Sequence, residues 1–267
     1  MRAALLALVA ALAAARGAEA EPRIASLDQC ADQYVLALAP RDEIVALSKR
    51  ALNDDSYLRG AAAGLPERRA TLETILGERA TIAVTYWAGE ARLPAQLAAR
   101  GVKVAQIDEA SDFAAVRANI RRVAAALDRR AAGEALIAAM DAKLARSGDA
   151  WGGAPALYLT TGSFTAGRRT LVGAMMAAAG LVSAEAASGY APVRLEELVL
   201  HPPAALVLGF FSDLASGRSH WTIAGNGYLR GLARRRTIAS LPGSMLGCPA
   251  WFAADGALAL AKARPAR

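Results

Sequence analysis

The sequence predicts an α/β protein of two small lobes with mostly parallel sheets, joined by one long connecting helix. Short apolar runs alternate with amphipathic runs in both halves of the chain, and a long proline-free helical stretch separates the halves. In addition, one phrase occurs twice, as TLETILGERATIAV at 71–84 and as RLEELVLHPPAALVL at 194–208. The glutamates of the two phrases, Glu73 and Glu196, are about 120 residues apart, which suits two similar lobes and is too long for a solenoid repeat.

Residues 1–20 have the pattern of a secretory signal peptide. One early positive charge precedes an apolar stretch at 3–15 and a small-x-small ending at 18–20. A membrane anchor is the weaker alternative, because Arg16 closes the apolar stretch well short of the roughly 20 residues that span a bilayer. Lipidation is not expected, because the residues before Cys30 are not small. The sequence therefore predicts a periplasmic protein that is monomeric, not membrane-embedded and begins at Glu21.

The first lobe is predicted at 21–110. Short buried strands are expected at 23–27, 44–48, 81–86 and 102–108, with helices at 32–38, 71–76 and 91–99 between them. Gly101 lies between the last helix and its strand, where a helix commonly ends. This alternation predicts a parallel sheet that is covered on both faces.

Residues 111–147 are predicted to form the connecting helix. Phe113, Val116 and Ile120 follow the spacing of an amphipathic helix, and a helix of this length would span roughly 54 Å. Gly133 leaves open the alternative of two ordinary helices that meet there.

The second lobe is predicted at 148–267, after a Gly-Gly-Ala-Pro break at 152–155. Its expected strands and helices alternate as in the first lobe: strands 156–160, 204–210 and 237–241, and helices around Met175-Met176, at 194–200, at 223–232 and from about Trp251.

Two cysteines, Cys30 and Cys248, lie near opposite ends of the exported chain. An oxidising compartment favours a bridge between them, which would tie the loop after the first strand to the last segment. The alternative is two unrelated buried thiols. The net charge of +7 comes mostly from scattered arginines, which indicates a solvated basic surface rather than a nucleic-acid site.

Catalytic signatures are sparse. The chain has two histidines, His201 and His220, and the position of His201 beside two prolines at a helix end favours capping. HExxH, CxxC, Gly-x-Ser-x-Gly and P-loop motifs are absent from the sequence. We therefore predict no enzyme activity, no catalytic residues, no cofactor and no metal site of its own.

Aromatic side chains follow several of the predicted strands. Tyr86 and Trp87 end one strand, Phe164 lies in a GSFTAG loop, and Phe210 and Phe211 end another strand. Ligands of open α/β sheets bind beyond the carboxyl ends of the strands, and aromatic rings there suit a flat or bulky ligand. The expected ligand contacts are Trp87, Phe164, Tyr86, Phe211 and, in the polar loop after the second strand, Tyr57. Core packing is expected for Phe210 and Tyr158.

The repeated glutamates are a second constellation. A glutamate in the first turn of a helix gains about 0.3–1 kcal/mol from the helix dipole, but this does not explain the same placement in both halves. If the lobes are alike, Glu73 and Glu196 project from one face of the molecule as a two-point acidic docking surface.

In order and spacing, these segments resemble the periplasmic substrate-binding proteins of ABC importers for vitamin B12, iron-siderophore complexes and haem. The resemblance covers nearly the whole exported chain, from RIASLDQCADQYVLALAPRDEIVALS through TLETILGERATIAVTYWAG to SFTAGRR and RLEELVLHPPAALVL. It implies two lobes joined by a single long helix, a shallow cleft and little hinge closure. It also implies that Trp87 and Phe164 contact the ligand and that Glu73 and Glu196 dock on the two permease subunits.

The expected ligand is therefore a metal chelate such as a corrinoid, a ferric siderophore or haem. By position in the family pattern, Arg168 and Arg169 are the only arginines expected at the pocket, which favours a neutral or weakly charged ligand such as a corrinoid. Two alternatives remain open, an enzyme on the same scaffold, such as a chelatase or a reductase component, and a ligand sensor. For the enzyme, His201 and His220 are the first candidates.

Overall fold

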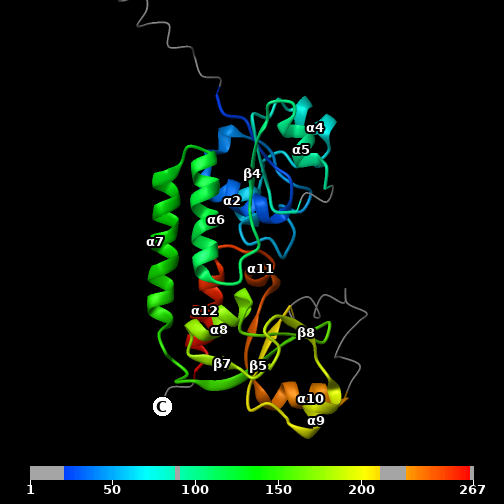
Figure 1. The fold of residues 1–267 in the computed structure, drawn as a ribbon, viewed down its shortest axis with the longest axis vertical. Coiled ribbons are helices and arrows are strands. Elements are labelled where there is room, and N and C mark those ends of the chain that lie inside the picture. Colours follow the sequence, from blue (N-terminus) through cyan, green and yellow to red (C-terminus); the bar gives the residue numbers. More distant parts are fainter. Residues whose placement is uncertain (1–20, 88–90, 211–226, 265–267) are drawn as a thin grey trace, which may run out of the picture.

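The computed structural model describes residues 21–87, 91–210 and 227–264, so the predicted signal peptide at 1–20 lies outside the described residues. The molecule consists of two α/β lobes stacked along its long axis, with one helix running along the side of both (Figure 1). The predicted fold class is confirmed. Within the described residues, each helix is too short or too polar to cross a lipid bilayer.

The first lobe is built on a parallel four-stranded sheet of order β2-β1-β3-β4. Its strands are β1 (Ile24–Ser26), β2 (Ile44–Ala46), β3 (Ile82–Thr85) and β4 (Lys103–Gln106). The residues of the central strand β1 and of the edge strand β2 are all buried, as expected for a parallel sheet that is covered on both faces. All four strands lie within the segments predicted from the sequence.

Helices cover both faces of this sheet. They are α2 (Gln29–Leu38), α3 (Arg59–Ala62), α4 (Leu72–Gly77), α5 (Leu93–Ala98) and α6 (Phe113–Ala126), with a 3-10 turn at Arg41–Glu43. One core contains Tyr34 and Val35 of α2 with Val116 of α6, and a second core contains Ile75 of α4 with Leu97 of α5. The side chains of Asp28, Thr71 and Asp112 cap the N-termini of α2, α4 and α6 by accepting backbone hydrogen bonds.

The second lobe has a parallel sheet of order β10-β9-β5-β7. Its strands are β5 (Ala154–Thr160), β7 (Leu181–Ser183), β9 (Leu206–Gly209) and β10 (Thr237–Leu241). A separate antiparallel pair, β6 (Phe164–Ala166) with β8 (Tyr190–Pro192), was not predicted. The helices are α8 (Leu171–Ala178), α9 (Leu195–Leu200), α10 (Gly227–Arg236), α11 (Gly243–Leu246) and α12 (Ala253–Lys262).

The stretch 111–147 is two helices, so the prediction of one continuous helix there is wrong. After α6, Asp128 takes a left-handed backbone conformation (φ 57°), and α7 (Arg130–Ser147) runs back along α6 toward the second lobe (Figure 1). The alternative of two helices is therefore the observed one, although the break falls before Gly133. That glycine has a packing role, because a Cβ at this position would lie 2.5 Å from the Cβ of Ala124.

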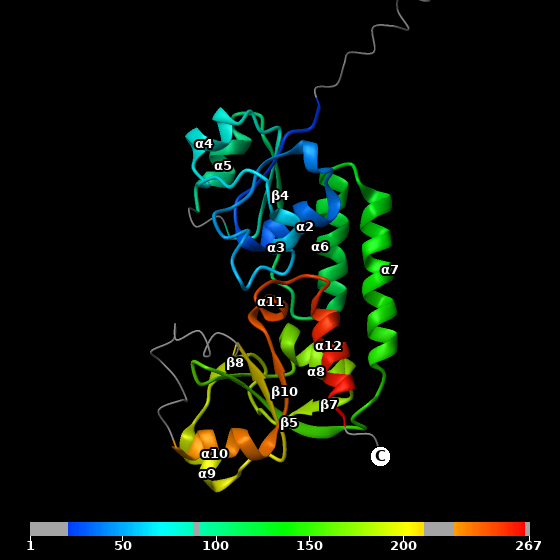
Figure 2. The same ribbon diagram turned by 180° about the vertical axis from the view of Figure 1, so that it is seen from behind.

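The C-terminal segment joins the lobes. Figure 2 shows α11 and α12 between the two sheets, and their side chains share one hydrophobic core with the first lobe. The predicted disulfide is present, between Cys30 at the start of α2 and Cys248 just after α11. Close by, the Tyr34 hydroxyl donates to the carbonyl of Pro249 (2.6 Å), and its ring packs edge-on against Trp251.

A polar cluster reinforces this junction. Asp255 of α12 pairs with Lys143 of α7 (2.7 Å) and accepts a hydrogen bond from Tyr57 (2.9 Å), whose ring stacks on Phe252. Three segments far apart in the sequence are thus held together at one point, which limits rotation of one lobe against the other.

Candidate functional site

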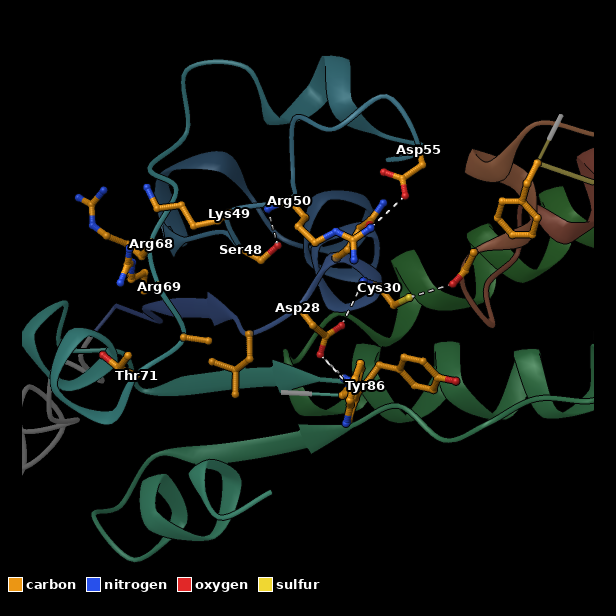
Figure 3. Close-up of a pocket in the computed structure, with 16 residues that line it drawn as sticks. Asp28, Cys30, Ser48, Lys49, Arg50, Asp55, Arg68, Arg69, Thr71 and Tyr86 are labelled. Atoms are coloured by element: carbon orange, nitrogen blue, oxygen red, sulfur yellow. Dashed lines mark hydrogen bonds and ion pairs between the residues drawn. The ribbon is translucent and has the colours of Figure 1, made fainter. Parts of the chain in front are cut away.

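A cavity of about 720 Å³ lies at the carboxyl ends of β1, β2 and β3 (Figure 3). This is the end of a parallel sheet at which ligands bind in open α/β folds. Most of the lining comes from the loops after these strands and from the segment before α4, and Phe210 and Gly247 contribute from beyond the first lobe. The lining residues are Leu27, Asp28, Gln29, Cys30, Ser48, Lys49, Arg50, Asp55, Arg68, Arg69, Ala70, Thr71, Tyr86, Trp87, Phe210 and Gly247.

Four basic side chains line this cavity, and the expectation that arginines there would be limited to Arg168 and Arg169 is wrong. Arg50 pairs with Asp55 (3.0 Å), and Arg68 pairs with Glu78. Lys49 and Arg69 are exposed and have no ion-pair partner among the described residues. The cavity therefore presents two positive charges that are not neutralised within this part of the chain.

Backbone pairing brings the basic residues together. Leu47, which follows β2, forms an isolated parallel bridge with Glu67, and its amide donates to the carbonyl of Pro66 (2.8 Å). The Arg68 amide in turn donates to the carbonyl of Leu47 (2.8 Å). This short ladder places Lys49 beside Arg68 and Arg69 at the cavity edge, as Figure 3 shows.

Aromatic residues form another part of the lining. Trp87 is 77% exposed, so a ligand rather than the protein core would cover its ring. The Tyr86 hydroxyl donates to the carboxylate of Glu109, and burial together with that carboxylate raises the pKa of Tyr86. Phe210 lines the cavity as well, so its predicted place in the core is wrong, whereas Tyr158 is buried as predicted.

The other predicted ligand contacts lie elsewhere. Phe164 is 49% exposed on β6, Arg168 is exposed just after it, and Tyr57 belongs to the junction with α12. None of the three lines the described cavity, and their ligand role stays a prediction. Phe211 lies outside the described residues.

Glu73 and Glu196, the predicted docking residues, occupy equivalent positions in the two lobes. Glu73 and Glu196 lie in the first turns of α4 and α9, and both are exposed. In both ribbon views these helices lie on the side of the molecule away from α7 (Figures 1 and 2). Neither carboxylate has an ion-pair partner among the described residues, whereas the neighbouring Glu197 pairs with Arg194.

Of the two histidine candidates, the structure describes only His201, and His201 does not line the cavity. His201 is the C-terminal residue after α9, faces a separate pocket of about 430 Å³ and lies 3.6 Å from Glu197. His220 lies outside the described residues. Within the described ranges, no three His, Cys, Asp or Glu side chains are grouped so that they could hold a metal ion.

A buried carboxylate, Asp32, lies beneath the loop that carries Lys49 and Arg50. Asp32 of α2 is fully buried and accepts hydrogen bonds from the amide (2.8 Å) and hydroxyl (2.6 Å) of Ser48, which precedes Lys49. Burial raises the pKa of Asp32 from 3.8 to about 6, opposed by the bonds from Ser26 and Ser48 and reinforced by the charge of Asp28.

Asp32 should make the protein less stable as pH rises. Between pH 4 and 6 the folded state holds a proton on Asp32 that the unfolded state has lost, so the contribution of this group to stability falls through that window. For Asp32→Asn, the free energy of unfolding relative to wild type should rise by about 2 kcal/mol between pH 4 and pH 7. Urea unfolding across this range measures the difference. An unchanged difference would show that Asp32 titrates normally.

Comparison with solved structures shows which proteins share this fold. No protein-family model and no curated protein matches this chain. The haem-binding protein RhuT from Roseiflexus sp. RS-1, in apo form, is 26% identical with a TM-score of 0.70, and the match covers 91% of this chain and 99% of that one. BhuT, solved in complex with two haems, is 25% identical over 90% of this chain and 97% of its own, with a TM-score of 0.69.

The vitamin B12-binding protein BtuF of Vibrio cholerae matches at 17% identity and a TM-score of 0.66, over 90% of this chain and 95% of that one. The chain thus has the fold of two-lobed periplasmic solute-binding proteins. The structures that share it include haem-, vitamin B12- and iron-binding proteins, as the sequence resemblance implied.

Proposed function

We propose that this protein is a periplasmic solute-binding protein that captures a metal chelate and delivers it to an ABC importer. The observation that carries the proposal is the cavity, where exposed Trp87 and partly buried Phe210 share one lining with Lys49 and Arg69, two cations that have no ion-pair partner among the described residues. Aromatic rings suit the flat or bulky body of a chelate, and the cations suit its acidic groups. The matches to haem-, vitamin B12- and iron-binding proteins support the same reading.

The charge of the cavity favours an acidic chelate over a corrinoid. Cations without internal partners gain charge-assisted hydrogen bonds from carboxylates or other anions of a ligand. Haem carries two propionates, and many ferric siderophore complexes are anionic. The preference for a neutral ligand rested on the absence of basic residues at the pocket, and Lys49, Arg50, Arg68 and Arg69 remove that premise.

A thermal-shift and absorption screen tests the function. Purified protein is titrated with haemin, a ferric tricatecholate complex, cyanocobalamin and cobinamide. Because ligand binding to the folded state raises the melting temperature by mass action, haemin or the tricatecholate should raise it, and the corrinoids should raise it less. Binding of corrinoids alone would overturn the ligand class. Failure of all four chelates to bind would count against the function itself.

Lys49 and Arg69 should contribute to the affinity for an acidic ligand but not to the stability of the free protein. In Lys49→Gln with Arg69→Gln, affinity for the acidic chelate that binds wild type should fall by at least about tenfold, because each charge-assisted hydrogen bond contributes about 1.5–3 kcal/mol. The melting temperature of the free protein should not change, because neither side chain has an ion-pair partner in the part of the chain that the structure describes. Isothermal titration calorimetry measures the affinity.

Arg130→Gln with Lys262→Gln is the matched control, because these exposed cations lie on α7 and α12 outside the cavity. Equal losses of affinity in the two double variants would indicate a general effect of net charge. Wild-type affinity in the Lys49 and Arg69 variant would remove these residues from the site.

A further inference from the structure

We infer that Asp28 is a positioning residue, an inference that rests on the proposed function. Asp28 fixes the backbone of Tyr86 and Trp87, whose rings form the aromatic wall of the cavity. The carboxylate receives five hydrogen bonds. Its Oδ1 accepts from the amides of Cys30 (3.1 Å) and Ala31 (2.9 Å) at the start of α2. Its Oδ2 accepts from the hydroxyl of Thr85 (3.2 Å) and from the amides of Tyr86 (2.7 Å) and Trp87 (2.9 Å). Figure 3 shows Asp28 between Cys30 and Tyr86.

Capping of α2 needs only one of these oxygens. Asp112 caps α6 through a single side-chain bond, from the amide of Ala115 (2.8 Å). The second oxygen of Asp28 is directed instead to the end of β3, the strand that pairs with β1. There it accepts hydrogen bonds from the consecutive backbone amides of Tyr86 and Trp87, whose aromatic rings line the cavity.

The position of Trp87 depends on this anchor more than on packing. Its side chain is 77% exposed, so few neighbours restrain the ring, and the bond from its amide to Asp28 fixes the backbone from which the ring projects. The Tyr86 side chain has a further restraint, because its hydroxyl binds Glu109. Gln106 donates to the Tyr86 carbonyl (2.9 Å), and this bond holds the peptide unit that also contains the Trp87 amide. Loss of the Oδ2 bonds should therefore loosen Trp87 first, and the ligand would then have to pay for ordering the ring.

The same bonds explain how a carboxylate can line a cavity for acidic ligands. Five donors surround the two oxygens, so the negative charge of Asp28 is directed at backbone amides and away from the ligand. Asp28 acts through Tyr86 and Trp87 and need not contact the ligand.

Asp28→Ser separates the two roles of the carboxylate. A serine hydroxyl still caps a helix, but one short side chain cannot also receive the amides of Tyr86 and Trp87. Asp112→Ser is the matched control, since it makes the same change at an N-cap that has no second partner. Haemin affinity should fall at least about tenfold in Asp28→Ser and stay at the wild-type value in Asp112→Ser. Should Asp28→Ser fail to fold, Asp28→Asn replaces it. The NH2 group of asparagine cannot accept hydrogen bonds, so the amides at the start of α2 or those at the end of β3 lose their acceptor.

A double-mutant cycle with Trp87→Ala distinguishes positioning from general destabilisation. If Asp28 acts through the aromatic wall, the affinity losses of Asp28→Ser and Trp87→Ala are not additive, and the double variant binds little worse than Trp87→Ala. Additive losses, wild-type binding by Asp28→Ser, or an equal loss in Asp112→Ser would each overturn the inference.

A ligand-free measurement keeps the inference testable if wild type binds no haemin. The chain has four tryptophans, so the fluorescence of Trp87 is isolated by subtracting the signal of the matching Trp87→Phe variant from that of each protein. Acrylamide quenching and anisotropy are then measured for this difference signal. Asp28→Ser should increase the quenching rate and lower the fluorescence anisotropy of Trp87, and Asp112→Ser should change neither. Unchanged quenching and anisotropy in Asp28→Ser would refute the positioning role, whatever the ligand proves to be.

Discussion

Replacement of both Cys30 and Cys248 by alanine is expected to lower the free energy of unfolding by about 5 kcal/mol. The two cysteines are 218 residues apart in the sequence, so the bridge closes most of the chain into one loop and restricts the unfolded state strongly. In the folded state the bridge lies beside the Tyr34 contacts, where the C-terminal segment meets the first lobe. Guanidinium or urea unfolding under oxidising conditions measures the loss.

Reduction supplies the control for this prediction. Wild-type protein in dithiothreitol should unfold at the midpoint of the double variant, and dithiothreitol should not shift the variant itself. A single cooperative transition is expected in both, because the core that contains Tyr34 also contains residues of the second lobe. A midpoint that does not respond to the substitutions would mean that the two cysteines are not bridged in the folded protein.

The double variant Glu73→Ala with Glu196→Ala is expected to abolish chelate uptake by cells while leaving chelate affinity unchanged. Both carboxylates are exposed in the first turn of their helices, on the side of the molecule away from α7, and neither has an ion-pair partner among the described residues. Two such charges favour a partner with basic residues at matching positions, as the two permease subunits of an importer would provide. Neither residue lines the cavity, so binding should be intact.

Growth on the chelate as the only source of its metal measures uptake, in a strain that lacks the chromosomal gene. Asp42→Ala with Glu197→Ala is the matched control, with one exposed carboxylate removed from each lobe and the same change in net charge. Uptake should continue in this control. Wild-type uptake in the Glu73 and Glu196 variant would refute the docking role.

Periodic and repeated features of the sequence predicted most of the fold. The buried strands around Ile24, Val45 and Val84 were predictable because each is a short, mostly apolar run between polar segments, too short for a helix. The break between α6 and α7 was not, because neither proline nor glycine marks Asp128, and apolar residues on both helices face a shared core. The β6–β8 pair was missed because neither segment is an apolar run: Thr165 lies in the middle of one strand, and Pro192 ends the other.

The candidate site was predicted in part. Tyr86 and Trp87 line the cavity as expected, because an aromatic residue at the end of a parallel strand has a defined place at the edge of the sheet. The basic lining could not be predicted, because the isolated bridge between Leu47 and Glu67 joins two loops with no detectable pattern. Phe210 was misplaced because its left-handed backbone (φ 64°) turns the chain just after β9, and such a conformation is rare for a bulky residue.

The junction around Asp255 has a consequence for unloading. Tyr57 and the Cys30–Cys248 bridge join the first lobe to the C-terminal segment, so a wider separation of the two lobes would have to break or strain both links. A captured solute would then leave on a timescale set by its own contacts with the exposed mouth. If the protein delivers its ligand to an importer as proposed, rapid release would require that the importer push the two lobes apart, and the importer would supply the work.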